Sequence, residues 1–450
     1  MKKNWLLLIA VVLLSNNMFA QQKDTLQFTL REAMRYAMEN NPQLKSVRLD
    51  EENNRYKIRE IRAGVLPQIS GNTGGTDNFE RASQLLPGDL MGQPGKKIPV
   101  KFGTRFVYNG NLQLNQTIYN PSLITGLKAA KESQGLYELH TFRTVEDIVY
   151  NMASLFIQIQ LTEKQKELYA GNIDRTEKLL DITSMQLKEG VAKKNDVEQL
   201  KVNLTNMKTQ LSNAENEYAK AIDNFKLLMN VDLEQPIAIT ASEEWEQIIV
   251  SKQLNLDANT DLKILDKQIQ LQNLNTANIK AEYLPTLSFT ANYGRQWQTE
   301  KLFNKDATVG FTSGYYSLNL NIPIFDGLKK HNQVIQSKIA VKQLELSKTF
   351  TAKNIQTQYR TATNNLNQNQ KVLEAQTQNM ALAEDLYNVA KLSYTEGISD
   401  LAELINAENS LREAQSQYLT AMLQTNLAEL ETMKTSGQLS ELIKTQSSVK

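Results

Sequence analysis

The chain of 450 residues contains no cysteine, so it forms neither disulfides nor metal sites built on thiolates. It has only two histidines, His140 and His331, and each lies in a predicted helix without neighbours suited to bind a metal. Lys and Arg number 50 against 49 Asp and Glu, a balance that gives no support to nucleic-acid binding. We therefore expect no cofactor, no metal ion and no nucleic-acid partner.

Long apolar runs are absent after the first twenty residues, so the mature chain is expected to have no transmembrane helix. At the start of the chain, two lysines precede an apolar run from Trp5 to Leu14, and Met18-Phe19-Ala20 follows. This pattern predicts a cleaved secretory signal peptide at residues 1–20. The apolar run is too short for a membrane anchor, since a helix needs about 20 apolar residues to span a bilayer.

Proline is scarce: the chain has nine, and residues 122–235 and 324–450 have none. Because proline inside a helix costs about 3 kcal/mol, long tracts without it favour long helices. Apolar residues recur there at helical spacing in a narrow stripe, which is typical of helices that pack side by side as coiled coils. Each tract is interrupted once by a glycine, Gly190 or Gly397, which predicts two helical hairpins with tight turns.

The same pattern occurs twice along the chain, and each segment has its counterpart a little over two hundred residues away. The matching pairs are Leu112–Asn120 with Leu318–Asp326, Val65–Pro67 with Tyr283–Pro285, and Gly190…Asp196 with Gly397…Glu403. Self-similarity in a fixed order indicates a duplicated unit. We predict that each unit consists of two strands followed by a long helical hairpin.

Alternating apolar and polar residues predict strands with one apolar face. The apolar positions are Phe106, Tyr108, Leu112, Leu114, Leu287, Phe289, Leu318, Leu320 and Ile322. By alternation alone, a soluble core and lipid explain such a face equally well. The strand lengths, the uncharged hydrophilic opposite face, and aromatic residues near strand ends favour lipid; these aromatics are Tyr119, Tyr293, Trp297, Tyr315 and Phe325.

A membrane sheet of four strands needs more than one chain. Unpaired strand edges do not occur in hydrocarbon, so the sheet must close on itself. The smallest membrane barrels have eight strands, and barrels of eight are filled by their own side chains. Three chains, which together supply twelve strands, are the smallest number that leaves a wide channel.

The order of these features resembles that of the TolC family of outer-membrane efflux channels, over nearly the whole mature chain. The resemblance rests on Phe28–Pro42, the two Leu-Pro pairs, Ile324–Gly327 and the two glycine turns. Within the first segment, Thr29 and Glu32 are predicted to form a capping box. The resemblance implies a mixed, mainly α-helical fold in a homotrimer. A twelve-stranded β-barrel in the outer membrane would be continuous with a periplasmic α-helical barrel.

The resemblance also implies roles for residues near the hairpin tips, which form the periplasmic entrance in this family. Asp196 and Tyr394 are expected to tie the closed entrance between neighbouring coils. Glu403 and Asn406 are expected at the constriction, where carboxylates favour cations, although Asn406 departs from the acidic pattern. Ser399 stands where a basic residue can help to hold the entrance shut in the family, and serine departs from that pattern.

The turns at Gly190 and Gly397 are expected to dock a periplasmic adaptor. The implied function is that of the outer-membrane channel of a multi-component efflux or secretion system in a Gram-negative bacterium. It would be a passive duct that carries substrates from an inner-membrane pump. A periplasmic coiled-coil scaffold or adaptor is the alternative. No enzyme is indicated, because the sequence lacks a nucleophile elbow, a phosphate-binding loop and a His–carboxylate cluster.

These inferences predict a first repeat over residues 21–230, an equatorial linker over 231–254, a second repeat over 255–436, and a polar tail over 437–450. The first repeat is predicted to contain a helix at 29–64, strands near 66–78 and 103–119, and helices near 122–188 and 194–230. The second is predicted to contain a helix near 257–282, strands near 284–297 and 311–325, and helices near 327–395 and 400–434. Residues 79–102 are expected to form an irregular exposed loop.

Overall fold

The computed structural model describes residues 25–92, 94–240, 253–302 and 308–439. The chain divides into two compact units. Unit 1 comprises residues 1–49, 139–263 and 349–450, and unit 2 comprises residues 50–138 and 264–348. The predicted signal peptide, half of the predicted linker and most of the predicted tail lie outside the described residues.

Seven α-helices are present in the described residues: α2 (Leu30–Asn40), α3 (Pro42–Ala63), α4 (Pro121–Lys188), α5 (Lys194–Met229), α6 (Thr260–Ala281), α7 (Lys329–Thr395) and α8 (Leu401–Ser436). The strands are β1 (Leu26–Phe28), β2 (Gln68–Asp77), β3 (Ser83–Pro87), β4 (Lys97–Lys101), β5 (Phe106–Tyr119), β6 (Ile237–Ile239), β7 (Thr286–Thr299) and β8 (Val309–Asn321). The predicted duplication is evident in the lengths: α4 and α7 have 68 and 67 residues, and α5 and α8 have 36 each.

The helix predicted over 29–64 is divided in two at Asn41, whose backbone leaves the helical region before Pro42. Proline disfavours the helical conformation of the residue before it, which explains the break. The Asn41 side chain uses the break twice. Its Oδ1 accepts a hydrogen bond from the Leu44 N–H (3.0 Å), and its Nδ2 donates to the Leu228 carbonyl of α5 (2.8 Å).

The segment over 79–102, expected to be irregular, instead forms the two-stranded hairpin β3–β4 around a short 3-10 turn, Gly88–Met91. The prolines led to the wrong prediction of an irregular loop. A two-stranded ribbon consists only of edge strands, where a missing N–H is tolerated. Leu86 lies opposite Ile98 in this ribbon. An ion pair between Lys101 Nζ and Glu80 Oε1 (2.6 Å) helps to fix its base.

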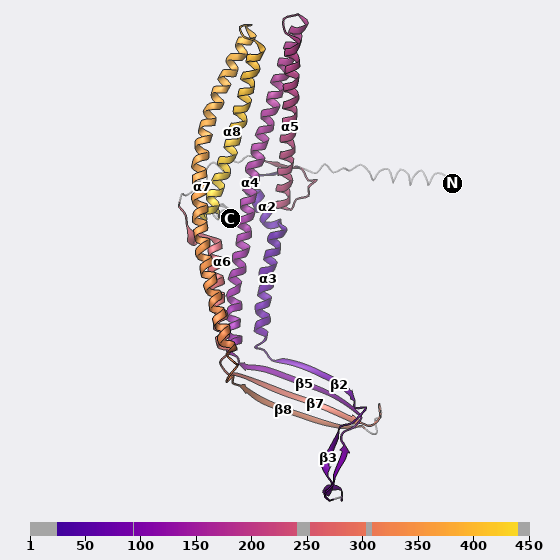
Figure 1. Ribbon diagram of the computed structural model, residues 1–450. Helices are drawn as coiled ribbons and strands as arrows, with labels where there is room; N and C mark the ends of the chain where they lie inside the picture. Colours follow the sequence, from indigo (N-terminus) through magenta and orange to yellow (C-terminus); the bar gives the residue numbers. More distant parts are fainter. Residues whose placement is uncertain (1–24, 93, 241–252, 303–307, 440–450) are drawn as a thin grey trace, which may run out of the picture. The chain divides into compact units, whose positions relative to one another are not determined.

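Unit 2 contains a four-stranded antiparallel sheet in the order β2-β5-β7-β8 (Figure 1). Within the described part of one chain, the outer edges of β2 and β8 have no strand partner. A bulge lies between Thr117 and Tyr119 of β5. The last strand ends at Asn321, short of the predicted residue 325, since Pro323 cannot donate to a sheet.

The segment that joins β8 to α7 contains two successive residues in the left-handed region, Gly327 (φ 68°) and Leu328 (φ 65°). For a residue with a side chain, this conformation costs about 1–2 kcal/mol. Asp326 compensates locally by capping α7, because its Oδ2 accepts a hydrogen bond from the Lys330 N–H (3.1 Å).

Unit 1 contains both hairpin tips, where α4 returns as α5 and α7 returns as α8 (Figure 1). Its main core joins α2, α4, α5 and α8, and the largest side chains fully buried there include Phe156, Phe225 and Met229. The capping box predicted at Thr29 and Glu32 is present and begins α2. None of the helices in the described ranges combines the length and apolar character needed to span a bilayer.

We predict that Phe225→Ala lowers the free energy of unfolding by about 3–5 kcal/mol, because it removes a fully buried aromatic ring and leaves a cavity. Leu227→Ala on the same helix is the matched control. Leu227 is exposed, and the expected change is within about 0.5 kcal/mol. Denaturant unfolding of the detergent-solubilised protein measures both, and equal losses would show that the core is placed wrongly.

Candidate functional site: channel wall and hairpin tips

One face of the four-stranded sheet carries no charged residue. Directly opposed residues of antiparallel strands point to the same face, so the register assigns every side chain. The polar face is formed mainly by Asn, Gln, Ser and Thr: Gln68, Ser70, Asn72, Thr76, Asn109, Asn111, Gln113, Asn115, Thr117, Thr286, Ser288, Thr290, Asn292, Gln296, Gln298, Ser313, Ser317, Asn319 and Asn321. Such a surface is readily hydrated without favouring ions of either sign.

Hydrogen bonds connect the polar face across three strands. Thr290 Oγ1 on β7 donates to Asn115 Oδ1 on β5 (3.2 Å), and Asn319 Nδ2 on β8 donates to Thr290 Oγ1 (3.4 Å). Gln113 Nε2 also donates to Asn115 Oδ1 (3.2 Å). These side chains are therefore held in place while their remaining donors and acceptors stay available to water.

The opposite face is mainly apolar, although it also carries Asp77 and Arg295. Eight of the nine residues predicted to face lipid lie on it: Phe106, Tyr108, Leu112, Leu114, Leu287, Phe289, Leu318 and Leu320. The ninth, Ile322, lies just beyond the end of β8 and is exposed. Leu112, Leu318 and Leu320 are also largely exposed within one chain. An apolar surface of this extent requires a covering phase or partner.

Two of the aromatic residues predicted to lie near strand ends are placed differently. Tyr315 lies opposite Asn292 and therefore belongs to the polar face. Tyr293 is on the apolar face but near the middle of β7. The alternation pattern identified the strands correctly but not the position of every aromatic ring along them.

The two hairpin tips have the same backbone construction. Gly190 (φ 80°) and Gly397 (φ 71°) are left-handed, a conformation in which glycine carries no steric cost. The N–H of the residue after each glycine donates to a carbonyl five residues earlier, Val191 to Gln186 and Ile398 to Ser393, both at 2.8 Å. This is the Schellman pattern of helix termination. Both glycines are thus turn residues.

The acidic residues that follow the two turns differ in what they contact. Asp196 Oδ2 accepts a hydrogen bond from the Lys193 N–H (3.0 Å), so this carboxylate caps α5. In the second repeat Asp400 takes the capping position, accepting from the Glu403 N–H (3.0 Å). The Glu403 carboxylate is exposed, and it has no partner among the described residues. Of these two equivalent positions, only the one in the second repeat therefore holds a carboxylate without a partner in the described residues.

The remaining predicted residues of the entrance are also placed. The Tyr394 hydroxyl donates to Gln186 Oε1 (2.9 Å), which links α7 to α4. Asn406 is exposed on α8, and its carbonyl accepts from Ser410 Oγ (2.9 Å). The Ser399 hydroxyl is enclosed without a partner in the described structure. Tyr394 thus contacts Gln186, a residue the sequence did not single out, and the structure gives no bond between Tyr394 and Asp196.

A family model described as "Outer membrane efflux protein" matches residues 33–231 and 253–438, which include both repeats. The chain belongs to this family. It is therefore an outer-membrane efflux protein of a Gram-negative bacterium, a channel component of a multi-component efflux system. A periplasmic scaffold, the alternative considered from the sequence, is excluded.

Individual members of the family match at low identity over most of their length. The toluene efflux pump outer membrane protein TtgF of Pseudomonas putida is 21% identical, covering 91% of this chain and 83% of that protein. The outer membrane protein TolC of Salmonella enteritidis is 20% identical, covering 98% and 87%. The crystal structure of the Campylobacter jejuni CmeC outer membrane channel superposes with a TM-score of 0.71 at 16% identity, covering 93% of this chain and 89% of that one. The fold is therefore that of the TolC-type channels.

In this efflux protein a buried carboxylate lies between the two helical hairpins. Glu408 of α8 is only 5% exposed, and its Oε1 accepts a hydrogen bond from Thr176 Oγ1 of α4 (2.8 Å). Burial and the nearby Glu408 charge raise the pKa of Tyr387 on α7, while Arg175 opposes the rise. The sequence gave no reason to separate Glu408 from its solvated neighbours, because its burial depends on which helices meet.

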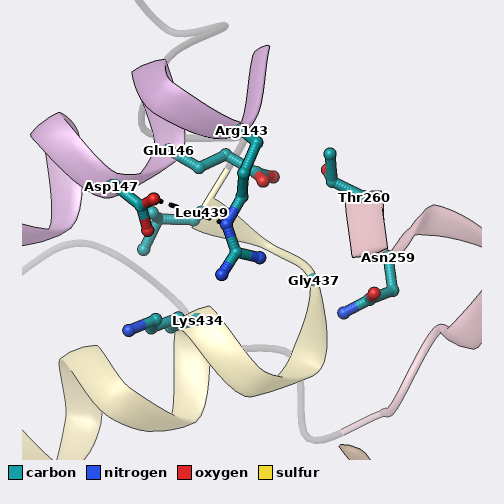
Figure 2. A pocket seen from close by; sticks show the side chains of 8 residues that line it. All are labelled: Arg143, Glu146, Asp147, Asn259, Thr260, Lys434, Gly437 and Leu439. Atoms are coloured by element: carbon teal, nitrogen blue, oxygen red, sulfur yellow. Dashed lines mark hydrogen bonds and ion pairs between the residues drawn. The ribbon is translucent and has the colours of Figure 1, made fainter. Parts of the chain in front are cut away.

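A second charged cluster lines a small polar pocket of about 30 Å³, shown in Figure 2. Arg143 of α4 contacts Asp261 Oδ1 through Nη1 (2.6 Å) and Asp147 Oδ2 through Nε (3.4 Å). Burial raises the pKa of the neighbouring Glu146 carboxyl. The nearby Thr260 hydroxyl partly offsets this rise in the pKa of Glu146, although it forms no well-directed hydrogen bond in the described structure. The pocket is the size of a few water molecules, so it is a structural cluster rather than a substrate site.

We predict that Glu146→Gln removes a pH-dependent loss of stability. Because the folded state raises the pKa of Glu146, it binds the proton more tightly than the unfolded state does. The wild-type protein should therefore lose stability relative to the variant as pH rises from about 4.3, the ordinary value for Glu, towards neutrality. Denaturant unfolding at several pH values measures this difference. Glu215→Gln, at an exposed position of α5, controls for the lost charge. A difference that does not change with pH would contradict the prediction.

Proposed function

We propose that three copies of this chain form a passive duct through the outer membrane and the periplasm. The duct would receive its substrates from an inner-membrane pump through a periplasmic adaptor. The observation that carries the proposal is the four-stranded sheet, which has one uncharged polar face, one mainly apolar face and two edges that are unpaired within the described part of one chain. The polar face would line the water-filled lumen, and the apolar face would contact lipid.

The unpaired edges support the number of chains. In hydrocarbon each unpaired backbone group costs several kcal/mol, so β8 of one copy would pair with β2 of the next until the sheet closes. Two copies would give an eight-stranded barrel filled by its own side chains. Three copies give twelve strands and leave a channel, while the helices α3, α4, α6 and α7 of each copy supply the periplasmic wall.

The chemistry of the wall supports a passive role. A lumen of amides and hydroxyls offers hydrated solutes a path without binding ions strongly. In this proposal the chain neither hydrolyses ATP nor couples protons, and the inner-membrane pump supplies the energy. Purified protein in a planar lipid bilayer should form ion-conducting channels, and its failure to conduct under any condition would overturn the proposal.

The entrance to the duct would lie at the hairpin tips. Tyr394 and Gln186 join the two hairpins of one copy, so breaking their hydrogen bond would let the second hairpin move outward. Asp196 would contribute by fixing the start of α5. Glu403 would place three carboxylates around the threefold axis, with Asn406 and Ser399 as uncharged neighbours.

The turns themselves would form the docking surface for the adaptor. Val191 and Ile398, which directly follow the two glycines, are both exposed apolar residues at equivalent positions of the repeats. An apolar side chain at the outermost point of each hairpin fits a contact with another protein better than a solvated turn.

We expect Tyr394→Phe to increase single-channel conductance, because it removes only the hydroxyl that binds Gln186. Gln186→Ala should have the same effect, and the two changes together should add little, since both break one bond. Tyr387→Phe, two turns earlier on α7, is the control. If Tyr394→Phe and Gln186→Ala both conduct like the wild type, this hydrogen bond is not part of the gate.

We also expect Glu403→Ala to weaken the block of the channel by divalent cations. A ring of three carboxylates in a narrow aperture binds such ions, and alanine removes all three. Glu413→Ala, farther along α8, tests whether any lost carboxylate has this effect. The half-blocking concentration of Mg²⁺ in bilayer recordings is the measurement. An unchanged value for Glu403→Ala would place the constriction elsewhere.

A further inference from the structure

The segment between β8 and α7 exposes an unusual amount of apolar surface. Ile324 is 93% exposed, Phe325 is 81% exposed and Leu328 is 58% exposed. The chain itself therefore does not cover these side chains. Together with the exposed Ile322, they make residues 322–328 one of the most apolar connections in the described structure; we refer to this segment as the apolar loop.

The register of the sheet locates the apolar loop. Asn321, the last residue of β8, pairs with Thr286 at the start of β7, and β2 also begins at this end of the sheet. The loop therefore lies at the end of the sheet where α3, α6 and α7 adjoin the strands (Figure 1). Leu66, Tyr283 and Leu284, which precede β2 and β7, are exposed at the same end. The apolar face of the sheet thus continues past the strands.

Backbone strain at Leu328 indicates that the side chain of this residue has a role in the loop. Leu328 adopts a left-handed conformation directly after Gly327. Glycine or asparagine would adopt it at lower cost, whereas a bulky residue there is a genuine outlier. A strained conformation persists where something else requires it. Within the chain the Leu328 side chain gains little burial in return, so it is available for a contact outside the chain.

Basic residues lie at the end of the sheet that carries the apolar loop, among the carboxylates of Glu282 and Asp326. Arg62 and Lys280 lie in the last turns of α3 and α6, Lys329 begins α7, and all three are exposed. Lys330 is held inward, with its Nζ 5.5 Å from the Tyr283 ring centroid and 3.6 Å from Asp326 Oδ2. Three helices thus present a cation without a partner in the described residues at the end of the sheet that carries the apolar loop, an arrangement that fits the phosphate groups of a membrane surface.

We propose that the apolar loop is a lipid anchor that inserts into the periplasmic leaflet of the outer membrane. Arg62, Lys280 and Lys329 would bind phosphates of the phospholipids around it. This inference rests on the proposed barrel, and lipid is the favoured occupant for two reasons. The loop continues the lipid-facing surface, and a neighbouring copy would pair with the edge of β8 rather than cover its apolar face. The three cations at the same end of the sheet also match phosphates.

The absence of cysteine allows a direct test by site-directed spin labelling. Ile324→Cys and Phe325→Cys are labelled with a nitroxide and reconstituted as assembled channels in vesicles of phosphatidylcholine and phosphatidylglycerol. Collision rates with oxygen, which enters lipid, are compared with those of a water-soluble nickel complex. Leu112→Cys on the apolar face of the sheet serves as the lipid reference, and Lys338→Cys on α7 serves as the aqueous reference.

We expect both loop labels to resemble the Leu112 label, with an oxygen-to-nickel collision ratio several-fold above that of the Lys338 label. Low collision rates with both reagents would mean that a neighbouring copy covers the loop, and frequent nickel collisions would mean that water does. Either result overturns the anchor. If the Leu112 label itself is not in lipid, the proposed barrel fails as well, which separates the two failures.

The role of the cations is tested by replacing Arg62, Lys280 and Lys329 together with alanine. Native mass spectrometry of the detergent-solubilised protein after addition of phosphatidylglycerol should show several-fold less bound lipid than in the wild type. The matched control replaces three other exposed lysines of α7: Lys338, Lys353 and Lys371. Equal lipid retention in the two variants would exclude a headgroup site at the end of the sheet.

Discussion

The backbone hydrogen bonds of the sheet impose the main constraint on this protein. A single chain supplies four strands to this sheet, and within its described part the outer edges of β2 and β8 carry unpaired donors and acceptors. Water can satisfy such groups, whereas hydrocarbon cannot. Because the chain belongs to a family of outer-membrane proteins, we proposed that other copies satisfy these edges. In the proposed duct, the assembly and the lumen follow from that requirement.

The duplicated architecture preserved backbone geometry and allowed the side-chain chemistry to diverge. The two tips end their helices with the same hydrogen bonds around Gly190 and Gly397. The acidic residue six positions after each glycine, in contrast, caps a helix in the first repeat and is uncommitted in the second. The two repeats can thus supply equivalent helices to one ring. Only the second hairpin carries the carboxylate, Glu403, that is proposed to line the entrance.

Much of this organisation could be predicted from the sequence, because it depends on local rules. Alternation identified the two faces of the sheet, and glycine within tracts without proline identified the tips. The prediction failed where local signals compete: Pro42 divided a helix predicted as continuous, and a loop with three prolines formed the β3–β4 hairpin. Contacts such as Tyr394 with Gln186 and Glu408 with Thr176 join residues more than two hundred positions apart. The packing of the helices decides which of many similar glutamines and glutamates form these contacts, and no local sequence pattern indicates it.

The account therefore depends most on the sharing of one sheet between three chains. The number of copies in the detergent-solubilised particle, measured as a mass by light scattering or native mass spectrometry, tests it most directly. We predict a particle that contains three chains and that requires detergent to remain in solution. A stable monomer that dissolves in buffer without detergent, or a closed dimer, would contradict the account.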